Sequence, residues 1–192
     1  SLAGAPQWSP IVSSGEAPTP RARHAAILDP IAERMIVFGG TDGSRSNDTW
    51  ALSLRDLTWA PIVPAGKLPA RRNAASAVYD ARRDRLVLFG GYEEGLSALG
   101  DTWALSLRNR IEWSRLNASI GTPPDWWTRS VVYDSRHDRM IQFGDMGDVC
   151  ALELGGTRGA EPKWTRWAFT GPVPSPRAAA ATFYDPLRDR VV

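Results

Sequence analysis

The side chains best suited to chemistry in this sequence are two histidines and one cysteine, and none of them stands in a catalytic or metal-binding pattern. His24 begins an apolar segment, whereas His137 lies in a polar Arg-His-Asp turn, so the two are not expected to share a metal ion. Cys150 lies among apolar residues with no activating neighbour, which predicts a buried, inert thiol. A Gly-x-Ser-x-Gly motif, a phosphate loop and zinc-ligand spacing are all missing. We therefore expect no catalytic residue, no metal and no cofactor.

Two adjacent tryptophans, Trp126 and Trp127, follow the prolines Pro123 and Pro124 and lie outside the regular tryptophan positions of the chain. If they are exposed, they form an aromatic platform for a sugar or a peptide. If they are buried, one or both rings fill the interior at a place where other parts of the sequence have an arginine. Both interpretations stay open at this point.

An internal repeat of about 50 residues dominates the chain. Trp8, Trp59, Trp113 and Trp164 are 51, 54 and 51 residues apart, and the same three intervals separate Asp29, Asp80, Asp134 and Asp185. Within each unit, short apolar or alternating segments end in Gly, Pro or Asp, and no segment shows a sustained helical period. Four short strands in each repeat of this length are typical of a β-propeller blade.

The repeated signature resembles that of the kelch family, in which a double glycine after an apolar strand is followed by two spaced aromatic residues. The residues that carry this likeness are Gly39, Gly40, Trp50 and Trp59; Gly90, Gly91, Trp103 and Trp113; and Gly144 and Trp164. The third unit departs from the pattern, because it has Asp145 for the second glycine, Cys150 for the first aromatic residue, and Trp126 where Arg21, Arg72 and Arg177 lie in the other units. The resemblance implies an all-β, kelch-type propeller.

The repeat also divides the chain. We expect one domain with a partial blade strand at 6–13, three complete blades at 21–63, 71–117 and 126–169, and a partial blade at 177–192. Such a set leaves a ring incomplete, so the chain is either a piece of a longer propeller, which we favour, or a protomer that shares blades with a second copy through open blade edges.

Loops of variable length on a rigid scaffold are where recognition usually occurs. The segment after the glycines spans nine positions from Gly40 to Thr49, eleven from Gly91 to Thr102, and four from Asp145 to Val149. The alternating strand directions place these loops and the connections between blades on one face. The candidate ligand-binding residues on that face are Asp42, Arg45, Tyr92, Glu93, Glu94, Trp126 and Trp127.

The composition excludes several partners. The net charge is only +2, and the arginines recur beside Asp and Glu instead of forming a basic block, which argues against nucleic acid. No stretch reaches the length of a membrane span. Only Lys67 and Lys163 are lysines among 23 basic residues, a bias typical of GC-rich bacterial genes. Location stays open, with a secreted or periplasmic protein favoured over a cytoplasmic one.

The resemblance implies a non-catalytic module that binds a protein or a glycan through its loop face. Two alternatives remain. A kelch-type sugar-modifying enzyme, mutarotase-like or oxidase-like, would need acid and base residues at the central channel, and an oxidase of the galactose oxidase type would also need copper ligands and a Cys–Tyr crosslink. A propeller fragment that assembles with itself would need only open edges.

Overall fold

The structure is a computed structural model that describes residues 9–118, 130–144, 147–155, 161–168, 170 and 181–192. Within these residues the regular structure is almost entirely β, and the single helical element is a short 3₁₀ turn, η1 (Glu94–Leu96). This confirms the all-β prediction. In the part of the chain that is described, no helix is both long enough and apolar enough to cross a lipid bilayer.

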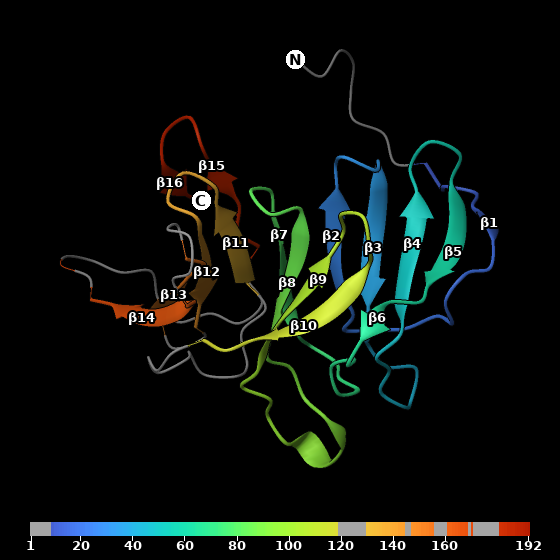
Figure 1. Ribbon diagram of the computed structural model, residues 1–192, viewed down its shortest axis with the longest axis horizontal. Helices are drawn as coiled ribbons and strands as arrows, with labels where there is room; N and C mark the ends of the chain where they lie inside the picture. Colours follow the sequence, from blue (N-terminus) through green and yellow to red (C-terminus); the bar gives the residue numbers. More distant parts are fainter. Residues whose placement is uncertain (1–8, 119–129, 145–146, 156–160, 169, 171–180) are drawn as a thin grey trace.

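Three antiparallel sheets of the same design follow one another along the chain (Figure 1), and in each one every main strand pairs with its neighbours in sequence. Blade 1 contains β2 (Ala25–Asp29), β3 (Arg34–Phe38), β4 (Thr49–Ser53) and β5 (Thr58–Ile62). Blade 2 contains β7 (Ser76–Asp80), β8 (Arg85–Phe89), β9 (Thr102–Ser106) and β10 (Glu112–Leu116). Blade 3 contains β11 (Ser130–Asp134), β12 (Arg139–Phe143), β13 (Val149–Glu153) and β14 (Lys163–Trp167).

A two-stranded hairpin, β15 (Tyr184–Asp185) and β16 (Arg190–Val191), follows blade 3. The first strands of the successive sheets, β2, β7, β11 and β15, lie side by side in that order. Stacked sheets whose first strands gather on one side are the architecture of a β-propeller, as the sequence predicted.

Blades 1 and 2 each carry a fifth, two-residue strand that the sequence did not suggest. β1 (Ser14–Gly15) pairs in parallel with β5, and β6 (Ala65–Gly66) pairs in the same way with β10. The predicted strand at 6–13 is wrong where it can be checked: residues 9–13 form no strand, and residues 6–8 lie outside the described residues. Pairing begins only at Ser14, whose amide donates to the Leu57 carbonyl at 3.0 Å.

The core lies between the blades and not within any one of them. The Trp113 ring of blade 2 packs on Phe38 of blade 1 with centroids 4.9 Å apart, and Trp164 of blade 3 packs on Phe89 of blade 2 at 4.7 Å. Both tryptophans are buried, whereas Trp59, the equivalent residue of blade 1, is only half-buried. Trp113 and Trp164 therefore wedge between neighbouring sheets, while Trp8 lies outside the described residues.

The paired glycines bring one blade close to the next. Gly39 has a φ of +63°, and a Cβ built on it would lie 2.7 Å from the Arg72 carbonyl oxygen of the following blade. The next amide, that of Gly40, donates to the same carbonyl at 3.0 Å. A side chain at Gly39 would therefore both strain the backbone and push the blades apart.

The turns between the first and second strands of each sheet are closed by the aspartate that recurs in every repeat. In blade 2, the Asp80 carboxylate accepts the backbone amides of Arg82 and Arg83 at 3.1 and 3.2 Å and the Arg85 Nε at 2.8 Å. Asp29, Asp134 and Asp185 accept the corresponding amides in the other turns. These are Asx turns, in which the side chain replaces a missing backbone partner.

Candidate binding face

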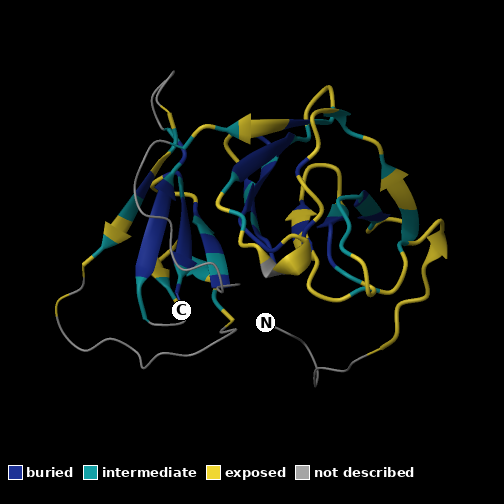
Figure 2. Ribbon diagram, turned by 90° about the horizontal axis from the view of Figure 1, so that it is seen from below, coloured by how far each residue is buried: buried dark blue, intermediate teal, exposed yellow. Residues whose placement is uncertain are grey.

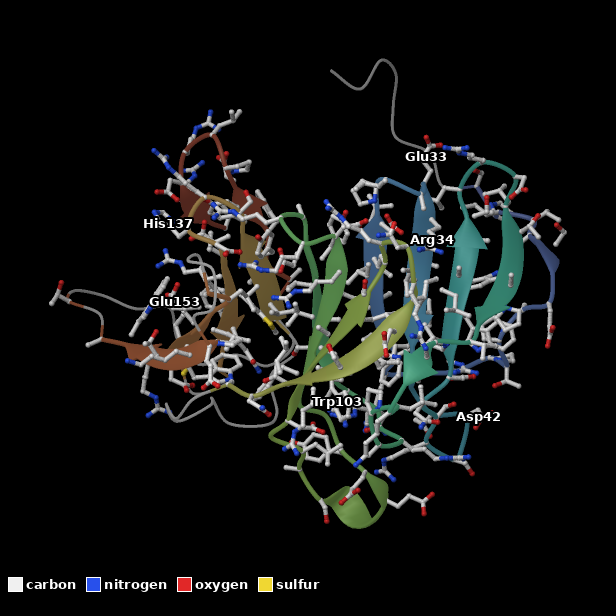
Figure 3. All side chains as sticks on the ribbon, viewed as in Figure 1. Glu33, Arg34, Asp42, Trp103, His137 and Glu153 are labelled. Carbon is white, nitrogen blue, oxygen red and sulfur yellow. The ribbon has the colours of Figure 1, made fainter. Side chains whose placement is uncertain are left out.

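The long loops and the short turns lie at opposite ends of the sheets. The loops at 39–48 and 90–101 and the connection at 63–75 lie at the lower end in Figure 1, and Figure 2 views the molecule from that end. Figure 3 shows Asp42 at this end and both Glu33 and His137 at the opposite end. We call the end with the long loops the loop face and the other end the turn face.

A buried ion pair fixes the base of the loop face in blade 2. The guanidinium of Arg72, which is fully buried, donates to both oxygens of Asp101 at 2.5 and 2.9 Å and to the Gly90 carbonyl at 2.9 Å. The Trp103 Nε1 donates to the same carboxylate at 2.6 Å. Burial raises the pKa of Asp101, but the bonds from Arg72 and Trp103 outweigh it, so the pKa lies below its usual 3.8.

Blade 1 repeats this arrangement. Arg21 binds both oxygens of Asp48 at 2.5 and 3.0 Å, and the Trp50 Nε1 donates to Asp48 at 2.7 Å. Burial again raises the pKa of Asp48, and the bonds from Arg21 and from Ser46 bring it below 3.8. Trp50 and Trp103 are therefore both packing residues and hydrogen-bond donors, a second role that the repeat alone did not reveal.

Blade 3 has a different residue at the tryptophan position, and its aspartate pairs with a different arginine. Cys150 is completely buried in the tryptophan position, as expected, and Asp148 pairs with Arg166 of the neighbouring strand at 3.1 Å. Arg166 thus takes over the charge that Arg21 and Arg72 supply in the other blades. Trp126, which occupies their sequence position, lies outside the described residues, as does Trp127.

A pocket of about 400 Å³ opens on the loop face of blade 1. Its walls are the segment from Glu16 to Arg21 and the loop from Gly40 to Asp48, and the Thr19 hydroxyl donates to Asp42 across them at 2.9 Å. Two predicted binding residues, Asp42 and Arg45, line this pocket together. Bonds from Thr19 and from the Ser44 amide lower the pKa of the exposed Asp42 carboxylate.

The other predicted residues lie on the 90–101 loop of blade 2. Glu93 and Glu94 are exposed at its tip, but the Tyr92 side chain is 7% exposed. The backbone of Tyr92 exchanges hydrogen bonds with Asn73 at 2.9 and 3.1 Å. Tyr92 therefore supports the loop from beneath and offers little surface to a partner.

The turn face carries a second polar network, which joins one blade to the next. Arg83 of blade 2 binds Asp80 of its own turn at 3.0 Å and both oxygens of Asp138 in blade 3 at 2.9 and 2.7 Å. The Tyr133 hydroxyl lies 3.2 Å from Asp80 and 3.0 Å from Asp138. These groups are satisfied by one another, so we assign them to holding the blades together.

His137 stands where Arg83 stands one blade earlier. Its Nδ1 lies 2.9 Å from Asp134 of its own turn and 3.7 Å from Asp189 of the following hairpin, and the ligand atoms of the three residues lie within 4.8 Å of one another. Asp134 also accepts Arg139 at 2.8 Å, which places a guanidinium against any cation there. The cluster therefore corresponds to the Arg83 bridge between blades.

Comparison with known proteins gives the same architecture and a family. The family model described as the KLHDC2/KLHL20/DRC7 Kelch-repeats domain matches residues 4–190. The bovine Kelch domain-containing protein 2 is 30% identical over 138 residues, which is 71% of this chain and 32% of that protein. Human Host cell factor 2 is 32% identical over 138 residues, 69% of this chain and 16% of that protein. The chain thus spans about a third or less of these curated relatives.

The flagellar outer arm dynein alpha chain of Chlamydomonas reinhardtii is 36% identical over 124 residues, 62% of this chain and 3% of that protein. Among solved structures, that of YjhT aligns with a TM-score of 0.59 at 14% identity, over 86% of this chain and 56% of that one, which is a likeness of fold. The named relatives are eukaryotic, so the bacterial source stays a prediction from composition. The match over nearly the whole length and the stacked four-stranded blades show that the chain belongs to the kelch-repeat family.

Proposed function

We propose that this chain is a non-catalytic module that binds a partner protein through its loop face. Members of the kelch-repeat family commonly mediate protein binding. The observation that carries the proposal is the pocket of about 400 Å³ on the loop face, in which Asp42 and Arg45 come together from a loop of variable length. Charged side chains beside a preformed hollow suit recognition of a protein surface.

The loop face is held rigidly enough to serve this purpose. The bidentate bonds between Arg21 and Asp48, and between Arg72 and Asp101, fix the loop bases before any partner arrives. A preorganised site loses less conformational entropy on binding, so more of the contact energy remains as affinity. The turn face, in contrast, uses Arg83 and its carboxylate partners for contacts between blades.

Selection from a peptide display library would test the proposal. The target is the whole chain, and the selected peptides are measured against two variants. The loop-face variant combines Asp42→Ala, Arg45→Ala, Glu93→Ala and Glu94→Ala. The turn-face control combines Arg55→Ala and Arg110→Ala, which remove exposed arginines from the opposite end.

We expect the selected peptides to bind the loop-face variant at least about tenfold more weakly, a change of about 1.4 kcal/mol, and to bind the turn-face control as they bind the parent. If no peptides are selected, or if binding is lost in the turn-face control instead, the proposed function is wrong. Binding of a glycan array in place of peptides would assign the face to carbohydrate.

A further inference from the structure

The pocket of blade 1 contains a cation whose hydrogen-bonding capacity is not used. The Arg45 Nε is buried and has no hydrogen-bond partner. Neither Arg45 nor Arg71, which also lines the pocket, forms an ion pair with any residue in the described ranges. The Arg45 guanidinium thus lines the pocket as a cation without a compensating carboxylate, and a ligand that brings an acceptor to its accessible part gains a charge-assisted hydrogen bond.

The acidic side chains of the pocket do not pair with Arg45 or Arg71. Asp48 already accepts bonds from Arg21, Ser46 and Trp50. Asp42 accepts bonds from the Thr19 hydroxyl and the Ser44 amide. The remaining acid, Glu16, is exposed on the pocket wall and forms no ion pair with a described residue.

Comparison with blade 2 explains why the hollow occurs in blade 1. The isolated bridge from Thr41 to Arg45 corresponds to the bridge from Tyr92 to Ala98. In blade 2, a large buried ring therefore stands in place of the small Thr41 side chain, and a methyl group stands in place of the arginine. The sequence of blade 1 thus combines free space with a cation at its edge.

We propose that this pocket binds an acidic side chain, Asp or Glu, from an internal segment of the partner protein. A carboxylate matches the planar donor array of arginine and pairs with Arg45, with Arg71 adding a second positive charge. The half-buried Trp50 ring offers an apolar surface to the methylene groups of the incoming residue. This inference rests on the proposed function, because it names the chemistry recognised by the same face.

The test is a double-mutant cycle between the protein and a peptide. Peptides from the selection, with both ends blocked, are compared with versions in which each Asp or Glu is replaced by Asn or Gln. Binding to the parent, to Arg45→Ala and to Arg45→Gln is measured by calorimetry, and Arg110→Ala serves as the control that removes an equal charge from the turn face. Melting temperatures verify that the Arg45 variants are folded.

We expect one acid-to-amide change to weaken binding to the parent about tenfold and to have little effect on either Arg45 variant. Glu16→Gln removes a repelling charge, so it is expected to strengthen binding of the acidic peptide about twofold. Loop-face peptides whose acids show no coupling to Arg45 would overturn the inference and leave the proposed function in place. Absence of any loop-face peptide would overturn both.

Discussion

Arg72 forms hydrogen bonds to three separate segments at the base of blade 2. Its guanidinium binds the Asp101 carboxylate at the start of β9, the Gly90 carbonyl after β8 and the Ala70 carbonyl in the connection from blade 1. Because the side chain is fully buried, its charge depends on Asp101 for compensation. Removing one partner of such a pair typically costs about 3–5 kcal/mol, since the other charge is left buried alone.

Replacing this carboxylate should change both stability and its dependence on pH. The folded-state pKa of Asp101 lies below 3.8, so its contribution to stability is present above the unfolded pKa and is lost as the pH falls through the folded pKa. We expect Asp101→Asn to unfold at a lower urea concentration than the parent at pH 6. We also expect the free energy of unfolding of Asp101→Asn to fall less between pH 6 and pH 3 than that of the parent.

Glu93→Gln, on the exposed loop tip, makes the same carboxyl-to-amide change without a buried partner and should follow the parent at both pH values within about 0.5 kcal/mol. Equal pH profiles for the parent and Asp101→Asn would show that the Arg72 pair does not contribute to acid sensitivity.

The connection between blades 1 and 2 is itself part of a sheet. Its two residues Ala65 and Gly66 form β6, the Ala65 amide donates to the Ile111 carbonyl at 2.9 Å, and the strand covers the outer edge of β10. Gly66 has a φ of +81°, and an added Cβ would lie 2.5 Å from the Trp113 carbonyl oxygen. Gly15 occupies the equivalent place beside β5 in blade 1.

Gly66→Ala should therefore detach β6 from β10. Gly95 is a matched control, because its φ of +79° gives the same backbone strain while a Cβ there would meet nothing within 4 Å. We expect Gly66→Ala to lower stability by at least about 1 kcal/mol more than Gly95→Ala, with faster hydrogen exchange along β10. Equal effects of the two substitutions would mean that β6 contributes little to the edge.

The main strands could be predicted from the sequence because each repeat places apolar residues at fixed intervals, and sheets stacked on both sides require those residues to be buried. β6 and β1 could not, because each has only two residues without an apolar pattern, and each pairs with a strand nearly 50 positions away. Local sequence patterns did not predict the pairing of Arg72 with Asp101 either. Its signal was the recurrence of both residue types, as Arg21 and Asp48, at corresponding places in blade 1.

The candidate binding face was predicted only in part for a related reason. Asp42 and Arg45 were candidates because they lie in a loop of variable length, and in the structure this loop turns back toward the segment from Glu16 to Arg21, so that both residues line one pocket. Tyr92 was placed on the surface because it lies in a long loop, yet the pairing of its backbone with Asn73 turns the ring inward. Loop length shows where variation occurs, but it does not show which side chain points outward.

Across the whole molecule, stability resides in the interfaces between successive blades. One cluster joins blades 1 and 2 around Phe38 and Trp113, and another joins blades 2 and 3 around Phe89 and Trp164. Since the middle sheet contributes to both clusters, it is buried on both faces, and the strand β8 contains four successive buried residues. Loss of one interface should therefore weaken the neighbouring blades together.

Trp113 and Trp59 allow this to be tested with the same residue at equivalent positions. Trp113 is 2% exposed between two sheets, whereas Trp59 is half-buried on the outer face of blade 1. We expect Trp113→Ala to lower the free energy of unfolding by about 3–5 kcal/mol, as measured by urea unfolding. Trp59→Ala should lower it clearly less. Similar losses for both would show that the interface between blades 1 and 2 is not where the stability resides.

The tip of the loop in blade 2 is separated from this framework by a narrow neck. The Glu93 amide donates to the Ser97 carbonyl at 3.1 Å, directly above the bridge between Tyr92 and Ala98. What lies beyond the neck can be exchanged for another segment with similar end spacing, while the buried ring and the charge pair below stay as they are. On the proposed function, replacing these few residues would change which partner binds, while the sheets below fold as before.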